Sequence, residues 1–173
     1  PDIYSKAYVK VQDLRYGENP HQKAAFYKDP EVKGGIADAK QLHGKELSYN
    51  NIVDMEAAWD LASEWKDQPA CAIIKHTNPC GCALGENALD AFKKAFAADS
   101  KSAFGGIVAM NRECDKATAE EMKPIFFEVV MAPKFSKEAL EVLETKKNIR
   151  LIEVPSLTHE ELQLHKVSGG LLI

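Results

Sequence analysis

Two basic side chains, Lys75 and His76, directly follow an apolar run that is typical of a buried strand, Ala70 to Ile74. An ammonium group can stabilise a developing oxyanion, and an imidazole can accept a proton near neutral pH. Three interpretations compete. The pair could be catalytic, it could join nearby cysteines in a zinc site, or it could be ordinary polar residues at the end of a strand. The dipeptide alone leaves all three open.

A zinc site is the interpretation that the local spacing tests most directly. Zinc deaminases carry H-x-E followed by P-C-x-x-C, in which the glutamate is the general acid and base. Here Asn78 stands two residues after His76, in place of the glutamate, and Cys80 and Cys82 are separated by one residue instead of two. The pattern therefore predicts no catalytic metal. A zinc-dependent nucleoside or base deaminase is kept as an alternative function.

The catalytic interpretation makes a demand on the backbone. Consecutive strand residues point to opposite faces of a sheet, so Lys75 and His76 can address one ligand only where the chain leaves the strand. Asn78-Pro79 and Gly81 are residue types that suit such a turn. We therefore expect the chain to leave the strand between the two residues or just after them, with the His76 imidazole available as a general base.

Other segments carry polar groups suited to recognition. Arg15 could bind a phosphate or carboxylate with two parallel hydrogen bonds, and Tyr16 could stack on a flat ring. Arg15 could equally pair with a nearby acid, and Asn51 could contact a ligand or cap the helix that follows it. Glu128 lies within the apolar run 126–133, where a carboxylate needs a partner or a site.

Strand-like and helix-like segments alternate in the chain after residue 50. Strands are expected over 70–74, 105–110, 126–133 and 149–154, and helices over 54–65, 86–99, 118–126 and 136–147. The expected caps of three of these helices are Asn51 or Asp54, Thr118 and Ser136. This alternation predicts an α/β fold with a mixed, mostly parallel sheet between helical layers. Ligands of such sheets bind beyond the carboxyl ends of the strands, where Lys75 and His76 are expected to lie.

The composition is that of a globular domain, with 173 residues, 45% apolar residues and a net charge of -4. The charge and the scattered basic residues argue against nucleic-acid binding, and no apolar run approaches the ~20 residues that span a bilayer. The four cysteines form no CxxC pair, which fits reduced thiols in the cytoplasm. Because the chain starts at Pro1 and stops in an apolar run after Gly169-Gly170, we expect a piece of a longer protein.

Six short strings, in order along nearly the whole chain, resemble the motifs of one family. They are LRYGENPHQ (14–22), ELSYNNIVD (46–54), IIKHTNPCG (73–81), SAFGGIVA (102–109), EVVMAP (128–133) and VSGGLL (167–172). The family is the 5-aminoimidazole-4-carboxamide ribonucleotide (AICAR) transformylase domain of the bifunctional purine-biosynthesis enzymes, in which it is fused to IMP cyclohydrolase.

The resemblance implies a cytidine-deaminase-like α/β/α fold, with residues 1–173 as the first of two transformylase subdomains. The second subdomain and the cyclohydrolase domain are then absent from this chain. The implied enzyme is a formyltransferase that moves a formyl group from 10-formyltetrahydrofolate, its co-substrate, to the 5-amino group of AICAR. No catalytic metal, nucleic acid or membrane is expected, and the full-length enzyme is expected to be a homodimer.

The same resemblance implies roles for the residues that match its motifs. His76 matches the catalytic base, and Lys75 matches the neighbour that stabilises developing charge. The matches to substrate contacts are Arg15, Tyr16, Asn51, Phe104, Gly105 and Glu128. Some members have the shorter aspartate at the position of Glu128. Because the family's site also uses residues of the second subdomain, a non-catalytic half-domain is a further alternative.

Overall fold

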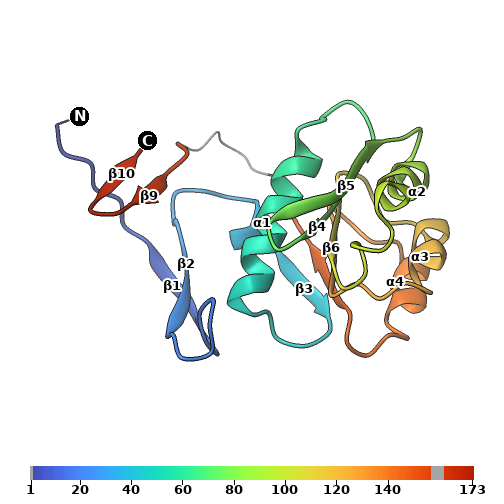
Figure 1. Ribbon diagram of the computed structural model, residues 1–173, viewed down its shortest axis with the longest axis horizontal. Coiled ribbons are helices and arrows are strands. Elements are labelled where there is room, and N and C mark those ends of the chain that lie inside the picture. Colours follow the sequence, from blue (N-terminus) through green and yellow to red (C-terminus); the bar gives the residue numbers. More distant parts are fainter. Residues whose placement is uncertain (1, 157–161) are drawn as a thin grey trace.

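The computed structural model describes residues 2–156 and 162–173, and its centre is a six-stranded sheet (Figure 1). The strands stand in the order β3-β8-β7-β6-β4-β5. Their bounds are β3 Lys40–His43, β4 Ala70–Lys75, β5 Asn78–Leu84, β6 Ile107–Met110, β7 Val129–Ala132 and β8 Arg150–Glu153. The strands expected from the sequence are all present, although β7 begins directly after Glu128 instead of containing it.

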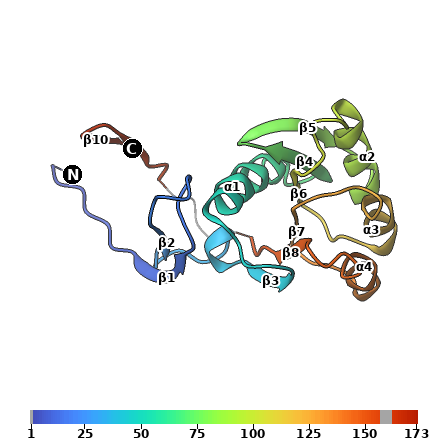
Figure 2. The ribbon, with the colours of Figure 1, turned by 60° about the horizontal axis from the view of Figure 1, so that its bottom comes forward.

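Helices cover both faces of this sheet (Figure 2). α1 lies on one face, and α2, α3 and α4 lie on the other. Their bounds are α1 Tyr49–Ser63, α2 Ala88–Ala98, α3 Lys116–Met122 and α4 Lys137–Leu143. The prediction of a three-layer α/β/α fold is therefore confirmed. Within the described residues, none of the helices is both long enough and apolar enough to cross a bilayer.

The two faces of the sheet form two separate apolar clusters, as the alternation of strand side chains requires. In β4, Ile73 belongs to the cluster that contains Phe92 of α2, whereas the next residue, Ile74, belongs to the cluster that contains Met55 of α1. All four side chains are at most 1% exposed. Burial on both faces explains why β4 is apolar over its whole length up to Lys75.

The sheet is mixed, but its neighbouring pairs are less often parallel than the sequence pattern predicted. β6–β7 and β7–β8 are parallel, whereas β3–β8, β4–β6 and β4–β5 are antiparallel. The reason is the hairpin between β4 and β5, which reverses the chain at once. As a result β4 lies between β5 and β6 and runs against both of them.

Polar side chains cap the helix N-termini, in part at positions other than those predicted. Ser136 caps α4 as expected, and its Oγ accepts a hydrogen bond from the N–H of Ala139 at 3.1 Å. α1 starts earlier than predicted, and its cap is Ser48 rather than Asn51 or Asp54. α3 is capped by Asp115 and not by Thr118. Each observed cap lies three residues before a predicted one, because the cap's side chain accepts a hydrogen bond from the N–H of the third helical residue, which is itself polar in both helices.

Two β-hairpins lie beside the layered body (Figure 1). One pairs β1 (Val9–Leu14) with β2 (Ala24–Lys28), and the other pairs β9 (His165–Val167) with β10 (Gly170–Leu172). Both carry exposed apolar side chains on their strands, although each has only two strands and therefore buries little surface itself.

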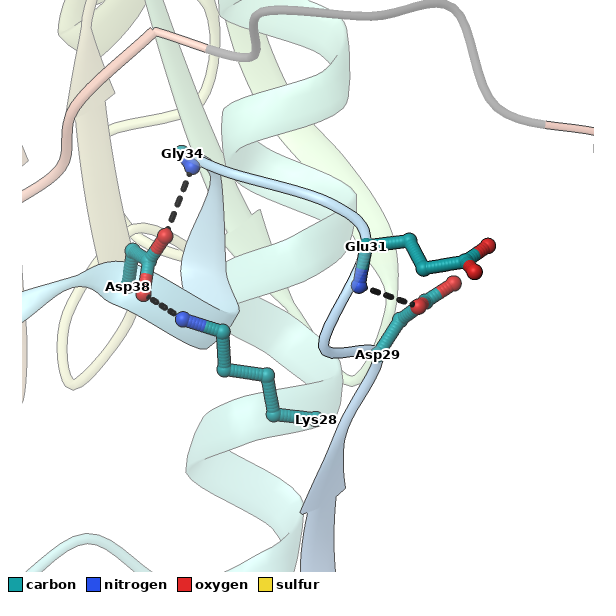
Figure 3. A network of polar contacts seen from close by, with 5 residues as sticks. All are labelled: Lys28, Asp29, Glu31, Gly34 and Asp38. Carbon is teal, nitrogen blue, oxygen red and sulfur yellow. Dashed lines mark hydrogen bonds and ion pairs between the residues drawn. The ribbon is translucent and has the colours of Figure 1, made fainter. Parts of the chain in front are cut away.

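A carboxylate ties β2 to the short 3-10 helix η1 (Ile36–Asp38), as Figure 3 shows. Asp38 Oδ1 accepts a hydrogen bond from the Lys28 ammonium, and Asp38 Oδ2 accepts one from the N–H of Gly34 at 2.8 Å. The Lys28 ammonium, and after it the Gly34 N–H, lowers the pKa of Asp38 below its ordinary value of 3.8. The ionised carboxylate therefore stabilises the folded state.

We predict that Asp38→Asn lowers the free energy of unfolding at pH 7 by about 1 kcal/mol, because the amide cannot form the ion pair. The pKa of Asp38 is depressed in the folded state, so its contribution is present above pH 3.8 and is lost as the pH falls through the folded-state value. The difference between variant and parent in urea unfolding should therefore shrink in acid. Asp60→Asn, on an exposed position of α1, is the matched control. An equal difference at pH 7 and pH 3 would contradict the prediction.

Candidate functional site

The predicted catalytic pair lies at the edge of the sheet where β6 and β7 begin. β4 runs antiparallel to β6, so its carboxyl end at Lys75 meets the segments that precede the parallel strands. Lys75 and His76 thus lie at the carboxyl end of a strand, as expected, but β4 is antiparallel to its neighbours, so this edge carries the amino ends of the parallel strands β6 and β7. This geometry explains how Gly105 and Glu128, which precede β6 and β7, come to lie at the edge where β4 ends.

Lys75 is joined to the loop before β6. Its Nζ donates a hydrogen bond to the backbone carbonyl of Phe104 at 2.8 Å. The Phe104 ring is 59% exposed and lies 5.3 Å, centroid to centroid, from the ring of Phe126 in the loop before β7. The ammonium is therefore fixed beside an aromatic pair at the surface, where its remaining protons can reach a ligand.

Hydrogen bonds hold these two loops together. Gly105 N–H donates to the carbonyl of Phe126 at 2.8 Å, and Glu128 N–H donates to the carbonyl of Gly106 at 3.0 Å. Gly105 has φ of +75°, a left-handed backbone conformation that residues other than glycine adopt only with strain. A glycine at this point lets the chain turn sharply from Phe104 into β6.

His76 lies in a two-residue turn between β4 and β5. Lys75 pairs with Asn78 across the hairpin, and the two residues between them, His76 and Thr77, have φ of 52° and 61°. The chain leaves the strand between Lys75 and His76, one of the two places that the sequence analysis allowed, but Asn78 and Pro79 belong to β5 and not to the turn. Positive φ at both positions is the type I′ pattern, which favours Asn-Gly. Each of these residues costs about 1–3 kcal/mol there, and the β-branched Thr77 suits the conformation least.

Three hydrogen bonds brace this turn. Thr77 N–H donates to Oδ1 of Asp54 on α1 at 2.7 Å. The carbonyl of His76 accepts from the Thr77 hydroxyl and from Nδ2 of Asn78, each at 2.7 Å. The His76 side chain itself is exposed. The turn thus presents the imidazole to the surface on a backbone that neighbouring groups hold in place.

Asn51 and Glu128 meet at the same edge. Asn51 Oδ1 accepts from the N–H of Ser48 at 3.1 Å, which completes the capping box of α1, while its Nδ2 donates to Oε2 of Glu128 at 3.0 Å. Asn51 is therefore not the N-cap but the second partner of the capping box, and its other amide group binds Glu128. Glu128, half-buried, has the partner that a carboxylate in an apolar run requires.

Arg15 and Tyr16 lie in the loop that follows β1. The Arg15 guanidinium lies 6.0 Å from the centroid of the Tyr16 ring. Their loop reaches the start of α1 through Asn50, whose Nδ2 donates to the carbonyl of Glu18 at 3.3 Å. The loop of Arg15 and Tyr16 is therefore bonded to the residue next to Asn51, and not to Asn51 or Glu128 themselves.

The cysteines near the turn do not form a ligand set. The pairing of β4 with β5 shifts register between Ile73 and Ile74, so that Cys80 lies in a bulge and Cys82 faces the opposite helical layer. Burial raises the pKa of both thiols, so the neutral forms predominate near pH 7. Among the described residues, no three His, Cys, Asp or Glu side chains converge as metal ligands would. This arrangement lacks the convergent thiolates of a zinc deaminase.

A large cavity in the described part of the chain lies away from Lys75 and His76. It has a volume of about 430 Å³ and is lined mainly by apolar residues of β2, of η1 with the segment before it, and of α1, among them Phe26, Ile36 and Trp59. The second, smaller cavity adjoins it. Neither is lined by Lys75 or His76.

The whole chain matches one protein family. The model of the AICARFT/IMPCHase bienzyme matches residues 1–173, which is the whole chain. The chain belongs to this family. The resemblance noted in the sequence motifs is therefore confirmed, and with it the membership of a bifunctional family of purine biosynthesis.

Curated relatives carry the same description. The bifunctional purine biosynthesis protein PurH of Thermoanaerobacter sp. (strain X514) is 54% identical over 173 residues, which is all of this chain and 34% of the relative. PurH of Bacillus subtilis (strain 168) is 53% identical over 176 residues, with the same coverage. PurH of Fusobacterium nucleatum is 54% identical over 96% of this chain and 33% of its own length. The chain thus spans about a third of the length of these relatives.

The structure adds three residues to the candidate site that the sequence analysis did not assign to it. Phe126 supports Phe104, Thr77 shares the strained turn with His76, and Asp54 binds that turn. Asp54 follows Asn51 by three residues, a spacing that puts both on one side of a helix and could have indicated a shared role. No local pattern marks Thr77 as left-handed.

We predict that Thr77→Gly raises the free energy of unfolding by about 1 kcal/mol, because glycine adopts φ of 61° without steric cost. Thermal or urea unfolding of the two proteins measures the difference. Thr145→Gly is a matched control, since Thr145 is also exposed and its hydroxyl also donates to a backbone carbonyl, but its φ is not positive. The control should be destabilised. A Thr77→Gly protein less stable than the parent would show that the turn carries no strain.

Proposed function

We propose that residues 1–173 form the first subdomain of an AICAR transformylase domain and contribute its catalytic base. The observation that carries this proposal is a chain of contacts that runs along one sheet edge. Lys75 binds Phe104, the loops of Phe104 and Phe126 bind each other, and Glu128 binds Asn51. These residues come from four separate segments, each of which carries one of the family-like motifs.

The nucleotide would lie along this edge. Arg15 has the forked guanidinium that suits a phosphate, and Tyr16 has a ring that suits stacking. Asn51 retains one amide proton beyond its bond to Glu128, so it can donate to a carboxamide or a hydroxyl. The exposed Phe104 ring and the backbone at Gly105 would border the reacting groups.

The chemistry requires a base and an oxyanion stabiliser. The 5-amino group of AICAR is a weak nucleophile, because its lone pair is delocalised into the ring and the carboxamide. Its nitrogen attacks the formyl carbon of 10-formyltetrahydrofolate, His76 accepts the amine proton, and the Lys75 ammonium faces the oxyanion that forms. The bond between carbon and N10 of the folate then breaks, N10 takes up a proton, and tetrahydrofolate leaves. A positioned base contributes about 10²–10⁴-fold, and one oxyanion donor contributes about 3 kcal/mol.

The rest of the proposed site lies outside these residues. The relatives are about three times as long as this chain, and His76 and Phe104 are exposed, as expected of a half-site that another surface covers. We infer that a second subdomain and a second copy of the full-length protein complete the folate pocket. The cysteines within the described part are free, which suits the reducing cytoplasm.

In the full-length bifunctional protein, we predict that His76→Ala lowers kcat for formyl transfer by about 10²–10⁴-fold and that Lys75→Ala lowers it by about 10²–10³-fold. IMP cyclohydrolase activity, measured in the same preparations, should not change, because it resides in another domain. Lys93→Ala is the control, since Lys93 forms only an exposed ion pair with Glu121. Parental formyl transfer in either test variant would refute the assigned roles.

We also predict that the isolated chain of 173 residues shows no formyl transfer above background with AICAR and 10-formyltetrahydrofolate. The reason is that a base without an enclosed folate pocket neither orients the two substrates nor excludes water. Turnover close to that of the full-length protein would mean that these residues contain a complete site.

A further inference from the structure

The bond between Asp54 and the hairpin turn is a contact that the proposed mechanism does not use. We propose that Asp54 is a positioning residue that holds His76 in its catalytic orientation by bonding the backbone of Thr77. This inference rests on the proposed function, because the orientation of His76 matters for catalysis only if His76 is the catalytic base. Asp54 acts through the turn and does not touch the imidazole.

The turn needs such a bond for two physical reasons. First, His76 and Thr77 both have positive φ, and together they cost about 2–6 kcal/mol relative to unstrained residues. Second, a two-residue turn closes with a hydrogen bond between its outer residues, here Lys75 and Asn78, which leaves the N–H of Thr77 without a partner in the hairpin. Asp54 Oδ1, at 2.7 Å, supplies that partner.

Asp54 is well placed to act as a fixed point. It is half-buried on α1, whose next residue, Met55, is 1% exposed within the apolar cluster that includes Ile74 of β4. A hydrogen bond from a backbone N–H to a carboxylate is stronger than one between neutral groups. The carboxylate is therefore held by the same helix–strand packing that fixes the base of the hairpin.

The same helix also fixes the other side of the site. Asn51, one turn before Asp54, binds Glu128 at 3.0 Å, and Asp54 binds Thr77. α1 thus sets the distance between the proposed nucleotide contacts and the proposed base. A shift of about 1 Å in a catalytic group can cost about 10²-fold in rate, so a turn released from α1 should lose kcat.

Three variants of the full-length bifunctional protein test this role. Asp54→Ala should lower kcat for formyl transfer by about 10- to 100-fold, with KM for AICAR changed less than about 2-fold and cyclohydrolase activity unchanged. Asp54→Asn should keep most of the activity, because its amide oxygen can still accept the bond from Thr77 N–H. Asp54→Ala with Thr77→Gly should stay as slow as Asp54→Ala, because glycine relieves the strain at position 77 but leaves the turn unattached to α1.

The results separate this inference from the proposed function. Loss of activity in His76→Ala together with parental kcat in Asp54→Ala would overturn the inference and leave the proposed function intact. Equal losses in Asp54→Asn and Asp54→Ala would also overturn it, since the charge and not the bond would then matter. A double variant with parental kcat would overturn it too, since attachment to α1 would then not matter. If Asp54→Ala alone does not fold, the double variant with Thr77→Gly and the Asp54→Asn variant still test the inference. Full activity in His76→Ala would refute the proposed function itself.

Discussion

The antiparallel pairing of β4 with β6 is the constraint on which the site depends. It brings the carboxyl end of β4 to the edge where β6 and β7 start, so that Lys75 meets the loops of Phe104 and Glu128. If β4 ran parallel to β6, its six residues would carry Lys75 about 20 Å away, to the opposite edge of the sheet. The grouping of residues 75, 105 and 128 is therefore a property of strand direction and not of the individual motifs.

Helix α1 is the second determinant of the arrangement. Its buried side packs on the sheet, and its first turns carry Asn51 and Asp54, which bind two different loops of the site. The strain of the turn, about 1–3 kcal/mol per residue, is comparable with what a few good hydrogen bonds contribute, so the turn is stable only with its braces. Rigid packing behind the edge allows a costly backbone conformation at the edge.

The location of the site on an open edge fits the size of the chain relative to its family. Two buried apolar clusters form the core of the layered body. Solvent, in contrast, reaches the Phe104 ring, the His76 turn and apolar side chains on both hairpins. The chain spans about a third of the length of its relatives, and the proposed function assigns the cover of these groups to the parts of such a protein that lie beyond the match.

The sequence by itself determined the layers, four of the six strands of the central sheet, the family and the candidate residues, because these follow from local periodicity and from strings such as IIKHTNPCG that stand in the chain as written. It did not determine the direction of β4, the left-handed turn at His76-Thr77 or the bond from Asp54. Those depend on which strands pair and on which helix lies beside the hairpin. Such contacts link residues more than 20 positions apart, so only the packing of the whole chain decides them.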